Sequence, residues 1–76
     1  MVKRNFIGDN VRRLRKIRNF TQEELAAKLQ IEGLNIDRPM ITKIELQQRE
    51  VYDYEAFYIS KVLKVSIEEL FKINNL

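Results

Sequence analysis

The 76-residue chain contains no cysteine and no histidine, and these two absences exclude several kinds of chemistry. Without cysteine there is neither a disulfide nor a thiolate nucleophile, and without both residue types the usual zinc sites cannot form. The common pairs of a nucleophile and its general base also need one of the two. We therefore expect no metal, no cofactor and no catalytic residues, and an enzyme is the weakest hypothesis for this chain.

Glycine, proline and long apolar runs are also scarce. Two glycines and one proline leave little room for hairpins. No apolar run approaches the ~18 residues of a membrane span, so we expect no membrane segment and no signal peptide. Hydrophobic residues make up 45% and charged residues 33%, which is typical of a folded soluble domain. We expect one small cytoplasmic domain over residues 1–76, with its core within residues 5–71.

The charges that are present are unevenly distributed. Residues 1–20 carry seven basic side chains and one acidic one, a net charge of +6. Residues 21–76 carry seven basic and ten acidic side chains, a net charge of −3. A basic cluster of this kind favours a polyanionic partner such as nucleic acid. A basic, solvated helix face without a partner remains the alternative.

Apolar spacing and capping residues predict five short helices. Apolar residues at helical spacing predict the first over about residues 5–18, and Asn19 can end it in the left-handed conformation. Thr21 and Glu24 form a capping box that begins a helix running to about Leu29, and Ser66 and Glu69 repeat this pattern before the last helix. The helix between them begins after Asp37, with Pro39 in its first turn, and ends near Leu46 or Gln47. Another helix runs from Asp53 or Tyr52 to about Lys64, and most of its apolar surface comes from Phe57, Ile59, Val62 and Leu63.

Three stretches of this pattern resemble a known family. They are Phe20-Thr21-Gln22-Glu23-Glu24-Leu25-Ala26, Ile41-Thr42-Lys43-Ile44-Glu45 and Val65-Ser66-Ile67-Glu68-Glu69-Leu70-Phe71. Together with Leu14-Arg15 they resemble the Cro/C1-type (XRE-family) helix-turn-helix, over about residues 5–71. The resemblance implies an all-α, compact, five-helix, lambda-repressor-like domain. It also implies binding of double-stranded DNA and regulation of transcription, most simply repression.

The resemblance assigns DNA contacts to individual residues. Gln22 matches a residue that typically holds a DNA phosphate, and a helix N-terminus suits an anion; a merely solvated glutamine is the alternative. The family presents the next helix to the major groove, which here implies contacts from Arg38, Pro39, Met40, Thr42 and Lys43. Arg38 and Lys43 can donate to guanine, although Lys43 could instead neutralise a phosphate. We expect backbone contacts from Gln47, Gln48 and Arg49, with Lys3, Arg4 and Arg12 also within possible reach.

The resemblance further implies an ion pair between Arg15 and Glu45 that joins the first helix to the end of the third. Two features depart from the family pattern. The turn Gln30–Ile36 is longer than the usual 3–4 residues, and we expect its Leu34 and Ile36 to fill the core and Glu32 to point away from DNA. Leu46-Gln47 also stands where the family often has Asn-Gly, so the third helix is expected to run slightly longer.

One short helix reads only a few base pairs, so we expect a homodimer on a near-palindromic operator. The expected dimer surface consists of Ile67, Phe71, Ile73 and Leu76, although these residues could simply cap the core. The alternative function is a protein-interaction module or an antitoxin, which uses the same fold to bind a partner protein.

Overall fold

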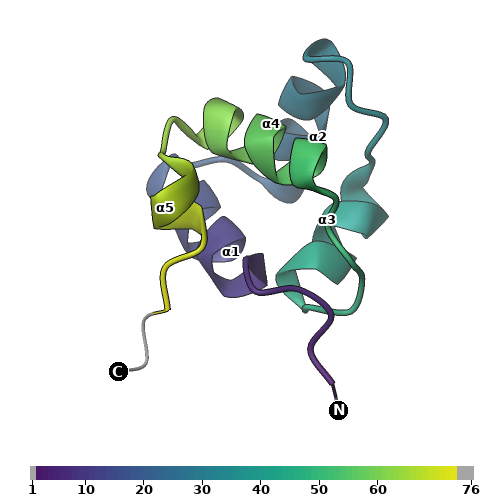
Figure 1. Ribbon diagram of the computed structural model, residues 1–76. Coiled ribbons are helices and arrows are strands. Elements are labelled where there is room, and N and C mark those ends of the chain that lie inside the picture. The colour runs from purple at the N-terminus through teal and green to yellow at the C-terminus, as the bar shows by residue number, and fades with distance from the viewer. Residues whose placement is uncertain (1, 74–76) are drawn as a thin grey trace.

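The computed structural model describes residues 2–73, and within them every regular element is a helix. This confirms the all-α prediction. The helices follow one another along the chain as Figure 1 shows. They are α1 (Gly8–Ile17), α2 (Gln22–Ile31), α3 (Arg38–Glu45), α4 (Asp53–Leu63) and α5 (Ile67–Leu70).

Aliphatic side chains from all five helices meet in one core. Its most deeply buried members include Val11 of α1, Leu25 of α2, Ile41 of α3 and Ile59 of α4. The loop between α2 and α3 adds Leu34 and Ile36, which are also buried. This confirms that the long turn fills the core, and it lets a 76-residue chain bury a continuous apolar interior without longer helices.

Side-chain caps begin most of the helices as the sequence predicts. The Thr21 hydroxyl accepts the N–H of Glu24 at 3.0 Å, and the Glu24 carboxylate accepts the N–H of Thr21 at 2.8 Å. Asp37 accepts the N–H of Met40. At α5, Ser66 accepts the N–H of Glu69.

The first helix begins at Gly8, three residues later than predicted. The reason is Asn5, whose Oδ1 accepts the N–H of Gly8 at 2.9 Å. The segment before Gly8 is therefore a cap rather than a helical turn. The sequence prediction included this segment in the helix because Ile7 has helical spacing with the apolar residues that follow. Ile7 is buried with them, although it precedes the helix.

Four helices end in the same way, with a residue in the left-handed conformation. These residues are Asn19, Gly33, Gln47 and Lys64, with φ between 59° and 97°. In each case this residue and the next one donate their N–H groups back to carbonyls of the last turn, which is the Schellman arrangement. The expectation of a longer third helix is therefore wrong. Gln47 adopts the conformation that a glycine would adopt, and α3 ends at Glu45.

Two apolar side chains differ from the simplest interpretation of the pattern. Met40 is half-buried and packs against the core, whereas the sequence places it on the free side of α3. Phe57 is exposed, because Ile59 and Leu63, four residues apart, form the inward face of α4. An aromatic side chain is thus left on the outer face of α4.

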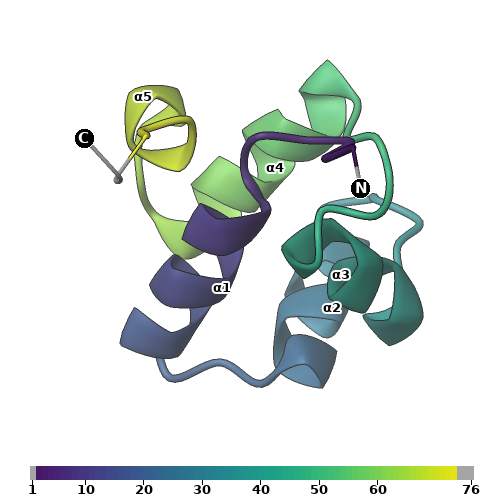
Figure 2. The same cartoon turned by 90° about the horizontal axis from the view of Figure 1, so that it is seen from below.

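The arrangement places α3 at one edge of the molecule and α5 at the opposite end (Figures 1 and 2). Figure 2 shows α2 and α3 side by side, as in a helix-turn-helix. Asn10 ties α5 to α1, because its Nδ2 donates to the carbonyls of Leu70 and Lys72. The outer face of α3 is left open for a partner.

Candidate nucleic-acid interface

Five of the predicted DNA-contacting residues line one open hollow on the outer face of α3. Four come from α3 itself and the fifth from the linker after it: Arg38, Pro39, Thr42, Lys43 and Gln48. Pro39 is the second residue of α3, after the Asp37 cap, where its missing N–H costs nothing. Thr42 and Lys43 each lie four residues after Arg38 and Pro39, so these side chains share one face of α3, and the turn at Gln47 brings Gln48 beside them.

A second hollow lies beside the first and shares Thr42 with it. It is lined by Gln22 at the start of α2, Gln47 after α3 and Arg12 of α1. Asp9 and Glu45 also line it and add negative charge. Three elements far apart in the sequence therefore contribute polar side chains next to α3.

Gln22 is held in place by α3 rather than extending freely into solvent. Its Nε2 donates to Oε1 of Glu45 at 3.0 Å, and its Oε1 accepts the Thr42 hydroxyl at 3.0 Å. A glutamine amide carries two N–H donors. One is used by Glu45, and the other can bind a phosphate oxygen at the N-terminus of α2.

Glu45 also receives Arg15, so that the ion pair implied by the resemblance is present. Arg15 Nε lies 2.7 Å from Glu45 Oε2, and Nη2 lies 3.1 Å from Oε1. The third guanidinium nitrogen donates to the carbonyl of Phe20 at 2.8 Å. The two side chains are 10% and 3% exposed, so this pair is shielded from water and links α1, the α1–α2 loop and α3.

The two cations of α3 differ in their surroundings. Lys43 is exposed and has no ion-pair partner among residues 2–73. Arg38 lies 3.6 Å from Glu23 of α2, and both side chains are well exposed. Such a surface pair is weak, so Arg38 can exchange Glu23 for a stronger anion or a guanine edge.

Two predicted contact residues lie outside both hollows. Met40 packs partly against the core. Arg49 donates from Nη1 and Nη2 to the two carboxylate oxygens of Glu55 at 3.3 and 3.2 Å, and only 20% of its side chain is exposed. DNA contacts by these two residues stay predictions.

A clasp made by the N-terminal segment is the main feature that sequence reasoning missed. Asn5 Nδ2 donates to the carbonyls of Ile44 and Arg49, and the N–H of Arg4 donates to the carbonyl of Gln47. Gln47 Nε2 in turn donates to the carbonyl of Asn5 at 3.0 Å. These bonds fix the linker that follows α3. The asparagine before the first helix is the only local signal, and it does not reveal partners about 40 residues away.

The Arg4 side chain adds an ion pair to the same clasp. Its Nε and Nη2 both lie 2.7 Å from carboxylate oxygens of Glu50. The hydrogen bond and the charge of Arg4 hold the pKa of Glu50 below its usual value, and Glu50 raises the pKa of Arg4. Arg4 is thus engaged with the linker. Glu32, which we expect to point away from DNA, pairs with Lys61 of α4 at 2.9 Å.

The residues predicted for the dimer surface are partly open. Ile67, Phe71 and Ile73 all expose a substantial part of their side chains, and Leu76 lies outside the described residues.

Nothing among the described residues forms a cluster of metal ligands, and no helix in that part of the chain is long and apolar enough to cross a membrane.

The α3 hollow therefore offers guanidinium, ammonium and amide donors to an anion, whereas the carboxylates of Asp9 and Glu45 lie in the neighbouring hollow. A comparison of the sequence with protein families finds a match over residues 11–70 to the family described as helix-turn-helix. The match runs from within α1 to the last residue of α5. No curated protein and no solved structure matches the chain.

Proposed function

Because the chain belongs to the Cro/C1-type helix-turn-helix family of DNA-binding transcription regulators, we propose that it is a cytoplasmic repressor that recognises a specific DNA sequence with α3. The observation that carries this proposal is the hollow in which Arg38, Lys43 and Gln48 come together around Thr42. An α-helix fits the major groove of B-DNA, where each base pair presents a distinct pattern of donors and acceptors.

Each polar residue of this face has a proposed part in binding. Lys43 and Arg38 donate to the O6 and N7 atoms of guanine, and Pro39 and Thr42 give shape and methyl contacts. Gln22 uses its second amide N–H to hold a phosphate, and Gln47 and Gln48 contact the DNA backbone beyond the C-terminal end of α3. Phosphate contacts set the position of the protein on the duplex, and base contacts supply the sequence preference.

The repressor acts as a homodimer in this proposal. An α3 of eight residues reads only a few base pairs, which is too little to define an operator by itself. Two copies related by a two-fold axis would bind half-sites about 34–36 Å apart on a near-palindromic sequence.

A protein-interaction module or an antitoxin is the second candidate. The observation that favours it is a set of exposed aromatic side chains at the start of α4 and on its outer face, none of which lines the α3 hollow: Tyr52, Tyr54 and Phe57. The rings of Tyr52 and Tyr54 stack with their centroids 5.6 Å apart. Such a surface suits a protein better than a phosphate backbone.

Salt dependence and a matched pair of lysine variants separate the candidates. Binding to duplex DNA is measured by fluorescence anisotropy at several salt concentrations for the wild type, Lys43→Ala and Lys28→Ala. Lys28 lies on α2 beside Phe20, outside the α3 hollow, and both variants lose one positive charge. We expect affinity to fall with a slope of about 0.9 per phosphate contact on logarithmic axes, and Lys43→Ala alone to lose discrimination between sequences. Equal discrimination in both variants, or no duplex binding by the wild type at low salt, would reject the proposal.

A further inference from the structure

Ile31 is the most exposed large apolar side chain among residues 2–73, with 83% of its surface accessible. It is the last residue of α2, at the start of the long turn that departs from the family pattern. Val62 of α4 lies beside it and is half-buried. The two side chains leave an apolar area in contact with water between the ends of α2 and α4.

Lysine side chains surround this apolar area. They form a hollow of about 310 Å³, here called the lysine hollow, which is lined by Lys28 of α2 and by Lys61 and Lys64 at the end of α4. Glu32 is the one carboxylate of its lining, and it is already paired with Lys61 at 2.9 Å. Glu24, one turn before Lys28, lies outside the lining and accepts an N–H group in the α2 capping box. Lys28 and Lys64 have no ion-pair partner among the described residues.

The backbone around the lysine hollow does not cancel this positive charge. Carbonyl groups at the C-terminal end of a helix repel an anion, and both α2 and α4 end here. At α4, Arg18 covers them, because it donates to the carbonyls of Leu63 and Lys64 at 2.8 and 3.2 Å. At α2, the N–H groups of Gly33 and Leu34 donate to carbonyls of the last turn. The exposed ammonium groups therefore dominate the electrostatics of the hollow.

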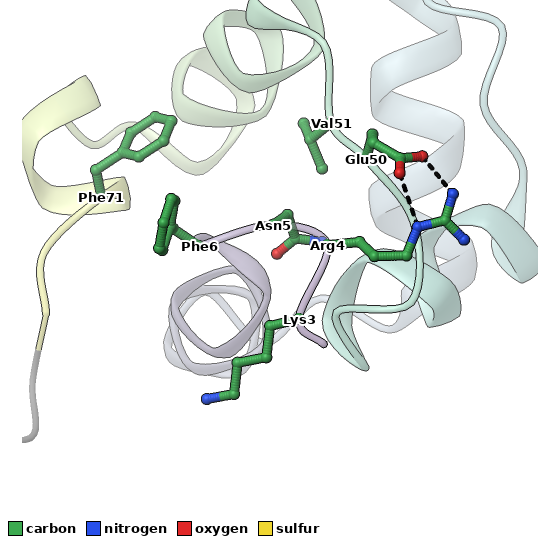
Figure 3. A pocket seen from close by; sticks show the side chains of 7 residues that line it. All are labelled: Lys3, Arg4, Asn5, Phe6, Glu50, Val51 and Phe71. Atoms are coloured by element: carbon green, nitrogen blue, oxygen red, sulfur yellow. Dashed lines mark hydrogen bonds and ion pairs between the residues drawn. The ribbon is translucent and has the colours of Figure 1, made fainter. Parts of the chain in front are cut away.

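The hollow beside Phe6 and Phe71 provides a contrast. It is also apolar, and its charged lining consists of Lys3, Arg4 and Glu50. Figure 3 shows the Arg4 guanidinium turned toward Glu50, at 2.7 Å, so that the molecule itself supplies the anion there. In the lysine hollow two ammonium groups are left without an internal anion, and another molecule can supply one.

We propose that the lysine hollow binds an acidic segment of a partner protein, with an aliphatic side chain on Ile31 and Val62 and carboxylates paired with Lys28 and Lys64. Charge complementarity selects an anionic partner. The exposed isoleucine selects a peptide over a phosphate backbone, because a chain of phosphates would leave Ile31 in water. This inference goes beyond the proposed function and does not depend on it.

The partner and DNA can bind at the same time. The lysine hollow and the α3 hollow share no residue. Lys28 lies six residues after Gln22 on α2, which places the two side chains about 120° apart around the helix axis. An acidic segment at the ends of α2 and α4 therefore leaves α3 free for the major groove.

Titration of the full chain with a short synthetic peptide, in which one leucine is flanked on both sides by aspartates, tests the site. Binding is followed through the backbone amide signals in heteronuclear NMR spectra. We expect saturable shifts at the residues of the lysine hollow. A second peptide, with serine in place of leucine, should bind at least about fivefold more weakly. Equal binding of the two peptides, or no binding of the leucine peptide, would overturn the proposal.

Two matched pairs of surface variants locate the binding site. Ile31→Ser is compared with Val2→Ser, which replaces an aliphatic residue that is 82% exposed in the N-terminal segment. Lys28→Glu is compared with Lys16→Glu, which reverses the charge of an exposed lysine on α1. Neither control residue lines the lysine hollow. We expect Ile31→Ser and Lys28→Glu each to weaken the leucine peptide at least about fivefold and the controls to stay within about twofold. Equal effects within either pair would contradict the assignment.

Duplex DNA separates this inference from the proposed function. Ile31→Ser should bind the duplex as the wild type does, because α3 is unchanged. The wild type should bind the leucine peptide equally well when it is saturated with duplex. Displacement of the peptide by the duplex would assign the lysine hollow to a phosphate backbone and overturn the inference. If the wild type binds the peptide but no duplex, the inference stands and the proposed function fails.

Discussion

Glu45 is the residue at which the contacts between α1, α2 and α3 converge. It receives Arg15 in a shielded ion pair and Gln22 through an amide hydrogen bond. Both partners lose their acceptor if the carboxylate is removed. The position of the reading helix relative to the phosphate-binding glutamine therefore depends on one side chain.

Glu45→Ala should lower the free energy of unfolding by about 3–5 kcal/mol, because it leaves the Arg15 charge buried without a partner. Urea denaturation followed by circular dichroism measures this. The control is Glu50→Ala, which removes an equally short ion pair at the surface, where both side chains are more than half exposed. Exposed pairs contribute little, so a similar loss in the two variants would contradict the special position of Glu45.

Gly8→Ala should destabilise the protein for a different reason, the close approach of two helices. A Cβ at Gly8 would overlap the carbonyl oxygen of Ile44 and lie 3.0 Å from that of Glu45, both in α3. Because backbone cannot move aside as a side chain can, we expect a loss of about 1–3 kcal/mol in the free energy of unfolding.

Gly33→Ala provides the comparison for that prediction. The substitution is the same, but no atom lies within 4 Å of a Cβ added at Gly33. Its cost comes only from a φ of 97° and should be about 1 kcal/mol. Chemical denaturation measures the free energy of unfolding of both variants. A Gly8→Ala variant as stable as the wild type would contradict the packing argument.

At the scale of single residues, the sequence predicts contacts that lie within one helical turn and misses those that do not. Arg15 and Glu45 were paired only because the chain resembles a family. Nothing local pairs Asn5 with the carbonyl of Arg49, 44 residues away. The sequence also does not show that Phe6, just before α1, is 73% exposed, because an aromatic residue before an amphipathic helix has the same pattern whether it is buried or exposed.

At the scale of the helix, three of the four left-handed ends are occupied by residues other than glycine. Lys64→Gly, after α4, should raise the free energy of unfolding by about 1 kcal/mol, because glycine adopts φ near 60° without the penalty that a Cβ brings. Arg12→Gly, in the exposed middle of α1, should instead lower it by about 1 kcal/mol. A thermal melt of each variant measures the difference, and destabilisation by Lys64→Gly would contradict the helix-end argument.

The capping box of α2 predicts a pH dependence. The N–H and hydroxyl of Thr21 hold the pKa of Glu24 below its usual value. The unfolded chain therefore binds the proton more readily, and the stabilisation by Glu24 is full above the unfolded pKa of about 4.3. It is lost as the pH falls through the lower pKa of the folded state.

Glu24→Gln should accordingly show a smaller loss of melting temperature between about pH 5 and pH 3 than the wild type. Glu68→Gln, at the first turn of α5, is the control because the carboxylate of Glu68 accepts no hydrogen bond from the described residues 2–73. An unchanged acid response in Glu24→Gln would show that the capping box does not titrate as proposed.

Helix starts were predicted better than helix ends, and the physical reason is the range of the interactions. A capping box such as Thr21 with Glu24 is complete within four residues. The end of a helix is set by a backbone conformation that several residue types can adopt, as Gln47 and Lys64 do here. For this reason the end of α3 was placed too late.

At the scale of the whole molecule, the fold places the α3 hollow beside a second hollow that is lined by segments distant in sequence. The predicted residues Arg38, Lys43 and Gln48 do share one hollow. The hollow beside it could not be predicted, because Arg12, Gln22 and Gln47 come to line one surface only after folding. Net charge indicated a polyanionic partner but gave no information about this surface.

The measurement that tests the central claim most directly is a selection of bound duplexes from a randomised DNA library, sequenced after several rounds. We predict enrichment of an inverted repeat whose half-sites lie one helical turn apart, with at least one guanine in each half-site. The enriched sequence should be lost when Lys43→Ala replaces the wild type. Duplexes without a common sequence, or the same repeat enriched by both proteins, would contradict recognition of DNA through α3.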